Sequence, residues 1–175
     1  MKVETIVVGP LKTNCYLLEK DSTWLIVDPG EEFSKIEEHI TGNVFGILLT
    51  HRHFDHVGAL ASCLDRYQVP VYDASSPSKK IQLGSFSFEI LATKGHTEDS
   101  ISFYFPEEQK LFAGDFLFFR TVGRVDLPTG SKDAMKESIA KIKHYPDTLE
   151  VYPGHGPKTT LGEEKQENPY FTNMW

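Results

Sequence analysis

The stretch LLTHRHFDHVGAL, residues 48–60, constrains this chain more than any other, because it places three histidines and an aspartate within six residues. A continuous helix would set His51 and His53 about 200° apart around its axis, so the two rings could not share an ion. In extended or loop backbone, residues two positions apart point the same way and can chelate one metal. The stretch is therefore predicted to be a loop that holds a metal ion.

Asp55 and His56 follow as neighbours in the same loop, and neighbouring side chains diverge from one another. We therefore expect them to serve a second site. An apolar run at 45–50 precedes the loop and a helical pattern at 57–67 follows it, so regular structure holds the loop on both sides. Imidazole and carboxylate ligands together suit zinc, iron or manganese.

Simpler roles exist for each of these residues taken singly. Asp55 could cap the following helix, and an isolated histidine is more often a surface or core residue than a ligand. Three imidazoles clustered beside a carboxylate at a strand end lack such an explanation, whereas a cation accounts for all of them. His39 and His144 lie in amphipathic helical patterns without such neighbours, and we expect no metal-binding role for them.

Three further candidates lie downstream, each next to a strand-like run. His96 follows the run at 86–93, and His155 lies in a Gly- and Pro-rich turn after the last run. Asp115 interrupts the apolar run 110–118, where burial of a carboxylate is costly unless a cation compensates it. The full set of candidate metal ligands is His51, His53, Asp55, His56, His96, Asp115 and His155. This set is too large for one tetrahedral site and suits two sites that share a carboxylate.

The rest of the chain alternates strand-like and helical segments. Amphipathic spacing predicts helices at 31–40, 57–67 and 131–145, the last capped by Ser131 or Asp133. Strand-like runs separated by turn signals are 2–8, 15–19, 23–28, 45–50, 69–73, 86–93, 100–105, 110–118 and 149–156. Strands with helices interspersed predict two mixed sheets covered by helices, a layered α/β fold.

Charge and cysteine content restrict the partners and the compartment. The 25 acidic residues outnumber the 18 basic ones, giving a net charge of −7, so we expect no nucleic-acid partner. The N-terminus lacks a signal-peptide core and no run approaches ~20 apolar residues, so no membrane partner is expected. Cys15 and Cys63 form no CxxC pair, which fits a reducing compartment. We expect a cytoplasmic protein with a single domain over 1–175, and the pattern leaves its oligomeric state open.

Five motifs are spread over nearly the whole chain: VDPG (27–30), THRHFDH (50–56), GHT (95–97), GD (114–115) and PGHG (153–156). With them the chain resembles the metallo-β-lactamase-fold hydrolases, specifically their glyoxalase II-like branch, the hydroxyacylglutathione hydrolases. GRVDLPTGS (123–131) and TTLGEEKQENPY (159–170) are similar to the short, one-domain members of that branch. The resemblance implies an α/β fold, the four-layer αββα sandwich, with its site where strand-end loops converge.

The resemblance also implies a role for each candidate ligand. It places His51, His53 and His96 on one metal, Asp55, His56 and His155 on the other, and Asp115 as the bridge. The implied cofactors are two divalent metal ions, with zinc expected first and iron or manganese as alternatives. Asp28 in VDPG either steadies a ligand histidine or forms the turn before Pro29.

The implied activity is that of a binuclear metallohydrolase acting on a small-molecule thioester of a 2-hydroxy acid, with S-lactoylglutathione as the leading compound. A hydroxide bridging the two metals would attack the carbonyl carbon, and a metal would stabilise the developing oxyanion. A thiolate leaves readily and needs little help from a general acid. Asp55 and Asp115 are the residues expected to take part in catalysis, Asp55 also by orienting the water.

The chain departs from the family pattern after its last histidine motif. Two-domain glyoxalase II enzymes continue into a helical segment that helps to bind glutathione, whereas 20 residues (156–175) follow His155 here. Arg120, Arg124 and Lys158 lie near motif loops and either contact an acidic thiol carrier or are solvated surface cations. Tyr152 is either a site hydroxyl or, as we favour, a strand aromatic. The aromatic tail PYFTNMW packs on the domain or on a neighbour.

Other functions compete with this hypothesis. A persulfide dioxygenase of the same fold would use one iron and leave the second trio idle, and a lactonase would open homoserine lactones. A class B β-lactamase is disfavoured because many carry a cysteine where Asp115 stands, and an RNA-processing nuclease is disfavoured by size and acidic balance. A non-catalytic metal-binding or interaction module is disfavoured because pseudoenzymes usually lose ligands.

Overall fold

The structure is a computed structural model that describes residues 1–172 and 175. Its strands are β1 (Lys2–Val8), β2 (Thr13–Lys20), β3 (Thr23–Val27), β4 (Asn43–Leu48), β5 (Val71–Tyr72), β6 (Lys80–Leu83), β7 (Phe86–Ala92), β8 (Ile101–Phe105), β9 (Lys110–Gly114), β10 (Leu117–Phe118), β11 (Thr121–Val122), β12 (Glu150–Pro153) and β13 (Thr159–Thr160). Its helices are α1 (Phe33–Glu37), α2 (Phe54–Val57), α3 (Leu60–Tyr67), α4 (Lys132–Ile142), α5 (Leu161–Glu167) and the 3₁₀ turn η1 (Pro169–Phe171).

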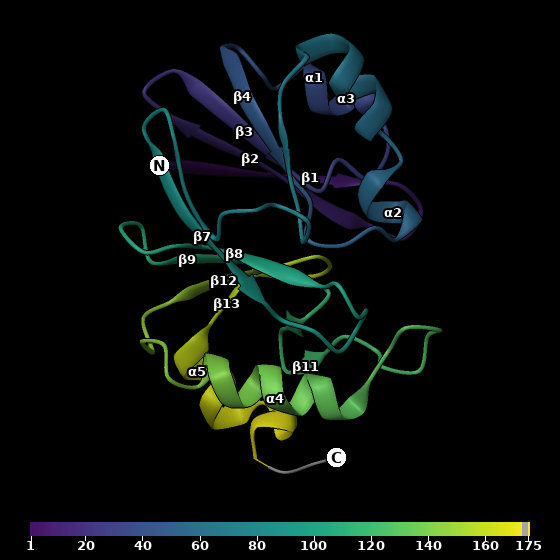
Figure 1. Ribbon diagram of the computed structural model, residues 1–175, viewed down its shortest axis with the longest axis vertical. Coiled ribbons are helices and arrows are strands. Elements are labelled where there is room, and N and C mark those ends of the chain that lie inside the picture. The colour runs from purple at the N-terminus through teal and green to yellow at the C-terminus, as the bar shows by residue number, and fades with distance from the viewer. Residues whose placement is uncertain (173–174) are drawn as a thin grey trace.

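Two large sheets form the centre of the molecule, with helices at its two ends (Figure 1). One has five strands in the order β1-β2-β3-β4-β5, and the other has six in the order β13-β12-β9-β8-β7-β6. Both are mixed, because β3, β4 and β5 are parallel, as are β9 and β12, while the other neighbours are antiparallel. Parallel neighbours need crossover connections, and α1, α2 and α3 lie within those of the first sheet. The predicted pair of mixed sheets is confirmed.

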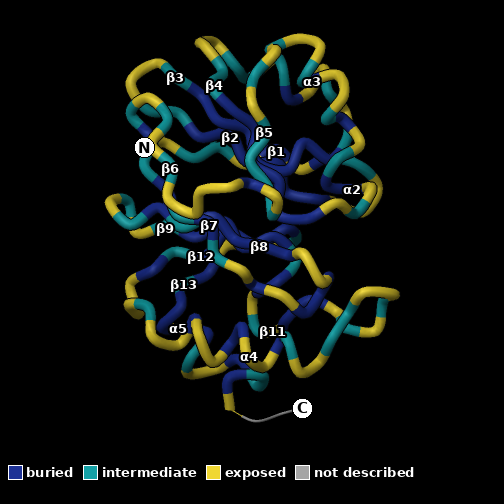
Figure 2. Tube along the Cα trace, viewed as in Figure 1, coloured by how far each residue is buried: buried dark blue, intermediate teal, exposed yellow. Residues whose placement is uncertain are grey.

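Side-chain alternation along the strands separates the core into three layers. In β3, Leu25 and Val27 point into the space between the sheets, whereas Trp24 and Ile26 pack outward with residues of α1 and α3. In β9, Phe112 points inward while its neighbours point outward to α4 and α5. Both faces of the central strands β3 and β9 are therefore buried (Figure 2), which explains why these two strands read as continuous apolar runs. The result is the predicted αββα sandwich.

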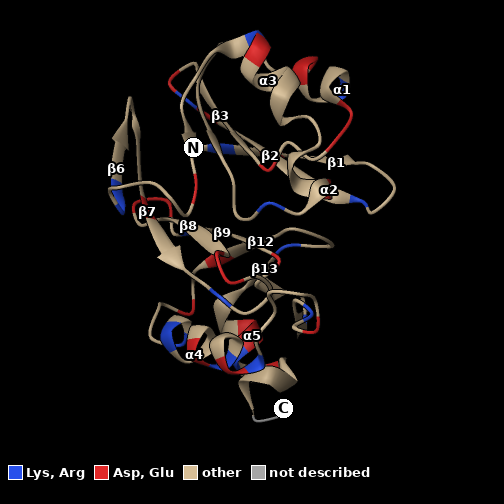
Figure 3. Cartoon of the chain, turned by 45° about the vertical axis from the view of Figure 1, so that its right-hand side comes forward, with Lys and Arg blue, Asp and Glu red and all other residues tan. Residues whose placement is uncertain are grey.

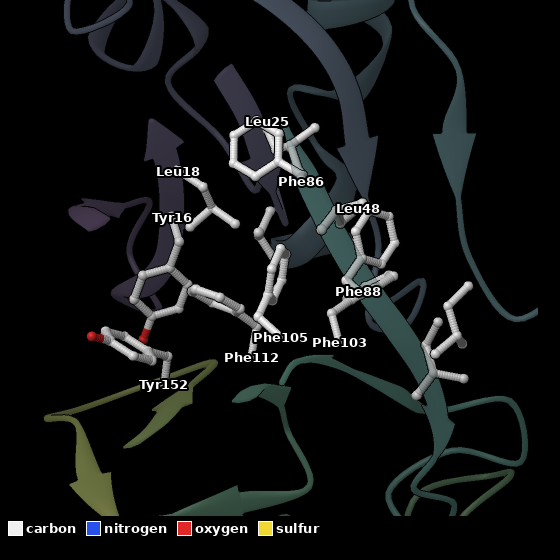
Figure 4. Packing of buried hydrophobic residues seen from close by; sticks show 13 residues of the cluster. Tyr16, Leu18, Leu25, Leu48, Phe86, Phe88, Phe103, Phe105, Phe112 and Tyr152 are labelled. Atoms are coloured by element: carbon white, nitrogen blue, oxygen red, sulfur yellow. The ribbon is translucent and has the colours of Figure 1, made fainter. Parts of the chain in front are cut away.

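Aromatic rings dominate the layer between the sheets (Figure 4). Tyr152 stacks on Phe112 with ring centroids 5.0 Å apart, and Tyr16 meets both rings edge-on. The Tyr16 hydroxyl donates a hydrogen bond of 2.6 Å to the carbonyl of Pro153. Tyr152 is only 6% exposed and is thus a strand aromatic of the core, as the sequence favoured. This contact couples the central core to the PGHG loop.

The predicted helix over 57–67 is wrong in its first turn. The structure has the one-turn helix α2 and then α3, separated at Gly58 and Ala59, so Asp55 and His56 lie in a helical turn and not in a loop. The break occurs because the chain packs against the turn after β3. The amide of Ala59 donates to the carbonyls of Pro29 and Gly30 at 3.0 and 3.1 Å, and a Cβ on Gly58 would lie 2.3 Å from the Gly30 oxygen.

The predicted strand over 110–118 is also wrong, because it is two strands in different sheets. β9 ends at Gly114, which has a φ of +52°, and β10 pairs with β11 in a separate two-stranded sheet. A Cβ on Gly114 would lie 2.3 Å from the Thr50 hydroxyl, so glycine permits both the turn and the close approach. Asp115 therefore lies beyond the end of β9 and does not interrupt a strand.

Helix ends account for other differences from the expected ranges. Ser131, not Asp133, caps α4, since its Oγ accepts from the amide of Ala134 at 3.2 Å. α1 is shorter than the predicted 31–40 and begins after Glu32, which has a φ of +53°. Acidic and basic residues are interspersed along the outer helices α4 and α5, as the colouring of Figure 3 shows. Among the described residues, no helix combines the length and apolar character needed to cross a membrane.

The C-terminal segment forms elements that the sequence did not predict. α5 begins with a capping box between Thr160 and Glu163. Its Glu164 is fully buried and accepts hydrogen bonds from Thr159, Asn168 and Arg120. Of the aromatic tail, Phe171 is buried with residues of α4, and Tyr170 and Trp175 pack against the same cluster, while 173–174 lie outside the described residues.

Candidate metal centre

The predicted ligands follow the C-terminal ends of strands that run toward one edge of the two sheets. His51 and His53 follow β4, and Asp55 and His56 lie on α2 directly after them. Three more follow β7, β9 and β12 in the second sheet: His96, Asp115 and His155. Strands β7, β9 and β12 run in one direction, so their ends meet at one edge and bring these loops together.

The first group consists of His51, His53 and His96. The Nδ1 atom of His53 lies 3.2 Å from Nε2 of His51 and 2.9 Å from Nε2 of His96. Nδ1 of His96 lies 2.8 Å from the carbonyl oxygen of Arg124, which can only accept, so that nitrogen carries the proton. The Nε2 lone pair of His96 is thereby directed at the other two rings. Three ring nitrogens converge in a geometry suited to one cation.

The second group consists of Asp55, His56 and His155. Oδ2 of Asp55 lies 3.5 Å from Nε2 of His56 and 3.3 Å from Nε2 of His155. Thr13 at the start of β2 donates a 2.8 Å hydrogen bond to the same oxygen. Nδ1 of His155 contacts the carbonyl of Leu11 at 3.1 Å, so its Nε2 also points inward.

Asp28 lies behind the second group. It is 2% exposed, and its Oδ2 contacts Nδ1 of His56 at 2.8 Å. The amide and hydroxyl of Thr50 donate to its two oxygens at 2.8 and 2.6 Å. Asp28, His51 and His56 also have ligand atoms within reach of one another. Because hydrogen bonds already use both Asp28 oxygens, Asp28 positions the His56 ring, which was one of its two expected roles.

Asp115 lies between the two groups. Its Oδ2 is 3.4 Å from Nε2 of His96 in the first group and 3.6 Å from Nε2 of His155 in the second. Its Oδ1 is 3.3 Å from Nε2 of His56. A Cβ on Gly154 would lie 2.2 Å from that oxygen, which explains the glycine before His155 in PGHG. This position is the one that the bridging hypothesis requires.

The buried polar atoms of the centre fit a divalent cation. Among the described residues, Nε2 of His56 and Oδ1 of Asp115 are buried without a hydrogen-bond partner. Leaving such atoms unsatisfied costs free energy, so native proteins rarely tolerate it without a ligand. The two atoms lie 3.3 Å apart, and imidazole nitrogen and carboxylate oxygen together suit zinc, iron or manganese.

Ionisation in the absence of a cation supports the same interpretation. Burial and the nearby His56 lower the pKa of His51 to about 3, and burial and His96 also lower the pKa of His53. These rings are neutral at pH 7 and able to ligate. Burial lowers the pKa of His56, but the carboxylates of Asp28 and Asp115 outweigh it and raise that pKa to about 10.

In the second group the histidine pKa values are raised, whereas those of His51 and His53 in the first group are lowered. Hydrogen bonds that the His155 ring donates to the carboxylates of Asp115 and Asp55 raise the pKa of His155 to about 10, against the effect of burial. Burial raises the pKa values of both carboxyl groups, but His155 and His56 lower them by more, so both pKa values are depressed. The carboxylates of Asp55 and Asp115 therefore favour the protonated, positively charged forms of His56 and His155. A bound metal ion would supply this positive charge in place of the protons.

The three cations considered for carrier binding each have a carboxylate partner. Arg120 contacts the buried Glu164 at 3.2 Å, and Lys158 contacts Glu150 at 2.9 Å. Arg124 forms a 2.8 Å pair with the exposed Asp126. Arg120 is thus a structural residue and not a solvated surface cation. No carrier role is favoured for any of the three.

Sequence reasoning missed several polar residues around the ligands. Thr13 and Thr50 hold Asp55 and Asp28 respectively. Asn14 donates from its side chain to the carbonyls of Pro153 and Gly156 at 3.0 and 2.9 Å. These polar residues lie next to sequence motifs or at the start of a strand. Their hydrogen-bond partners lie up to 142 positions away in the chain, so the local sequence does not reveal the contacts. Only Thr50, inside THRHFDH, carried a local signal.

Comparison with known proteins identifies similar sequences. The profile of the family described as "Metallo-beta-lactamase superfamily" matches residues 8–75 and 76–155. The Bacillus subtilis protein named "Probable metallo-hydrolase YqgX" is 34% identical over 209 aligned positions, covering 99% of each chain. The Haemophilus influenzae protein named "Hydroxyacylglutathione hydrolase GloC" is 31% identical over 210 positions, again covering 99% of each.

Solved structures match the whole fold. The crystal structure of the B3 metallo-beta-lactamase BLEG-1 superposes with a TM-score of 0.94 at 32% identity, covering 98% of this chain and 100% of that one. The structure of TTHA1623 in a di-iron-bound form gives a TM-score of 0.87 at 33% identity, covering 96% and 100%. The αββα architecture is therefore shared over the full length of the chain.

Proposed function

Because the chain belongs to the metallo-beta-lactamase superfamily, we propose that it is a binuclear metallohydrolase that cleaves thioesters of 2-hydroxy acids. The position of Asp115 between two three-residue donor groups is the observation that carries the proposal. The relative named hydroxyacylglutathione hydrolase supports the choice of thioester, with S-lactoylglutathione as the leading substrate. The metal is zinc by first expectation, with iron or manganese as alternatives; a similar structure is described as di-iron-bound.

Each donor group would hold one ion. His51, His53 and His96 would bind the first, and Asp55, His56 and His155 the second, with Asp115 shared. Divalent cations held there would polarise the thioester carbonyl and lower the pKa of an attacking water molecule.

The side chains of the chain itself would orient the reaction. Asp55 presents a carboxylate oxygen, held by Thr13, that can accept a hydrogen bond from the attacking water. Asp28 and the carbonyls of Leu11 and Arg124 fix the outer nitrogens of three histidines, so that no ring has to reorient during turnover. The thiolate leaves without a general acid because thiols are far more acidic than alcohols.

β-Lactam hydrolysis is the second candidate. It is favoured by the 32% identity and TM-score of 0.94 to a structure described as a B3 metallo-beta-lactamase. The same donor groups could serve this reaction, since both substrates present a carbonyl carbon to a nucleophile. Relative rates on a thioester and on a β-lactam therefore decide between the two activities.

The test is a substrate panel on protein reconstituted separately with zinc, iron and manganese. S-Lactoylglutathione, a homoserine lactone, a β-lactam and a persulfide, the last followed by oxygen consumption, are compared by kcat/KM. We expect the thioester to exceed each of the others by at least about 100-fold, which corresponds to about 2.7 kcal/mol of transition-state stabilisation. A preference for the β-lactam, the lactone or the persulfide would overturn the thioesterase proposal.

Variants link the activity to the donor groups. His53→Ala removes one nitrogen of the first group and should abolish turnover together with one equivalent of bound metal. His144→Ala is the matched control, because His144 is exposed and belongs to neither group. A His53→Ala protein that turns over the thioester without metal would refute the assignment.

A further inference from the structure

Residues 115–124 form a hairpin that reaches the candidate metal centre with both of its ends. Its strands β10 and β11 pair with each other in a separate two-stranded sheet. Asp115, the candidate bridge, directly precedes this pair of strands. Arg124 follows it, and the carbonyl of Arg124 contacts Nδ1 of His96 at 2.8 Å. The position of this segment, which we call the 115–124 hairpin, therefore sets both the bridging carboxylate and the orientation of one candidate ligand ring.

The base of the 115–124 hairpin is closed, so its two ends are coupled. The amide of Gly123 donates to the carbonyl of Phe116 at 3.3 Å. A Cβ on Gly123 would lie 1.8 Å from the carbonyl oxygen of Asp115 and 3.3 Å from the Cβ of His96. The two arms and His96 thus pack at a distance that only glycine permits. A shift of the hairpin would consequently displace Asp115 and disturb His96 together.

The tip of the hairpin is held from outside by α5. Arg120, at the turn between β10 and β11, has a φ of +63°, which is unfavourable for a residue with a side chain. Its amide donates to Oε2 of Glu164 at 2.9 Å, and its Nη1 donates to Oε1 of the same carboxylate at 3.2 Å. The side-chain amide of Asn168 donates to Oε2 of Glu164 at 2.8 Å and to the carbonyl of Thr121 at 3.1 Å. One buried carboxylate therefore holds the turn directly and through Asn168.

The stability of α5 does not by itself account for a buried carboxylate at Glu164. The helix already has a capping box made by Thr160 and Glu163. Glu164 is fully buried, and burial of an ion pair contributes little to stability compared with well-packed apolar residues. Such a pair with all its hydrogen bonds formed does fix one geometry, which an isolated two-stranded hairpin cannot do alone. The buried pair therefore points to a role at the hairpin.

We propose that Glu164 is a positioning residue of the metal centre, which acts through Arg120 and the 115–124 hairpin on Asp115 and His96. The inference rests on the two-metal site of the proposed function and is independent of the substrate. Metal ligands have to be held within about 0.5 Å of their required positions, so loosening of the hairpin would weaken metal binding. A residue of the C-terminal helix thereby controls a centre to which it contributes no ligand.

The experiment measures cobalt(II) binding to the full chain after chelation and reloading. Cobalt(II) absorbs visible light with an intensity that depends on its coordination geometry, so its spectrum reports on the ligands directly. Glu164→Gln keeps the shape of the side chain, but its NH₂ group accepts no hydrogen bond, so Arg120 loses one contact. We expect the Kd of cobalt, measured by competition with a chelator, to rise about 10-fold, with an altered spectrum at saturation. In the thioester assay kcat should fall about 10-fold while KM stays within about 2-fold of wild type.

Two further variants separate positioning from general stability. Arg120→Gln should shift the Kd and the spectrum in the same direction, and it decides the matter if Glu164→Gln does not fold, because the Arg120 side chain is 27% exposed. Thr160→Ala is the matched control, since it removes the cap of α5 and leaves the contact between Glu164 and Arg120 in place.

Wild-type cobalt affinity and spectrum in Glu164→Gln and Arg120→Gln would overturn the inference. Equal losses in Thr160→Ala would overturn it as well, because they would reduce the effect to destabilisation of α5. Failure of the proposed function is distinguishable. In that case the wild type itself binds fewer than two equivalents of cobalt or hydrolyses no thioester, whereas the inference alone fails if wild type and variants bind two equivalents equally well.

Discussion

Asp28 shows how a residue outside the seven candidate ligands can position one of them. It has a φ of +49°, an unfavourable region for a residue with a side chain, directly before Pro29. Its buried carboxylate accepts from the amide and hydroxyl of Thr50 and contacts the ring of His56. The strained turn is tolerated because it places one carboxylate where it contacts both Thr50 and the ring of the candidate ligand His56.

Asp28→Asn tests this role. The amide keeps the shape but loses the charge, and its NH₂ group can accept no hydrogen bond, so His56 or Thr50 loses a partner. We expect metal affinity at the second group to fall about 10- to 100-fold, with a matching loss of activity. Metal content and chelator titration measure the affinity, with Asp65→Asn on the exposed face of α3 as control. Wild-type affinity in Asp28→Asn would show that the carboxylate is dispensable.

At the scale of elements, side chains at strand edges tie neighbours together. Glu150 on β12 pairs with Lys110 on the adjacent strand β9 and with Lys158 before β13. These two lysines lower the pKa of Glu150 to about 2, from an ordinary value of 4.5. Because the folded pKa is depressed, the carboxylate stabilises the fold above about pH 4.5, and this contribution is lost as pH falls toward 2.

Glu150→Gln should therefore destabilise the protein at neutral pH by about 1 kcal/mol, a value reduced by solvent screening. The difference in the free energy of unfolding between wild type and Glu150→Gln should be constant between pH 5.5 and 7. It should shrink at pH 3, because the stabilisation that ionised Glu150 gives the wild type is then partly lost. Urea denaturation at several pH values measures this difference, with Glu98→Gln as control, since Glu98 is exposed and pairs with no cation among residues 1–172 and 175. A difference that grows on acidification would contradict the assigned pKa shift.

At the scale of the whole molecule, the candidate metal centre joins the two sheets. Its first and second groups both draw ligands from loops of each sheet, and Asn14 and Tyr16 of β2 bind the carbonyl of Pro153 at the end of β12. A cation bound there would contact both halves of the sandwich. Metal binding and global stability should consequently be linked.

Metal removal tests this linkage. Chelation of fully loaded protein should lower Tm by about 5 to 10 °C, because a ligand at 100 times its Kd contributes about 2.7 kcal/mol. Calorimetry with and without chelator measures the shift, and readdition of metal should restore it. His53→Ala should show a smaller shift, since it retains only the second group. An unchanged Tm after verified metal loss would show that the two sheets pack independently of the centre.

Much of this protein was predictable from local sequence. The HRHFDH stretch, GHT, GD and PGHG identified the seven candidate ligands, because spacing and neighbouring apolar runs are properties of the chain itself. The αββα layering and the family were predicted as well, and the structure and the comparisons confirm both. The metal-binding roles of the seven residues stay predictions, although their side chains converge as those roles require.

Tertiary structure decided the rest, since the forces responsible act between residues far apart in sequence. The helix break at Gly58 depends on Gly30, and the end of β9 at Gly114 depends on Thr50. No local pattern contains these contacts. The same holds for the candidate metal centre, whose donor side chains come from loops of both sheets and converge only in the folded chain. Sequence alone determined which candidate donor side chains the chain carries, and packing determined that they converge at one edge of the two sheets.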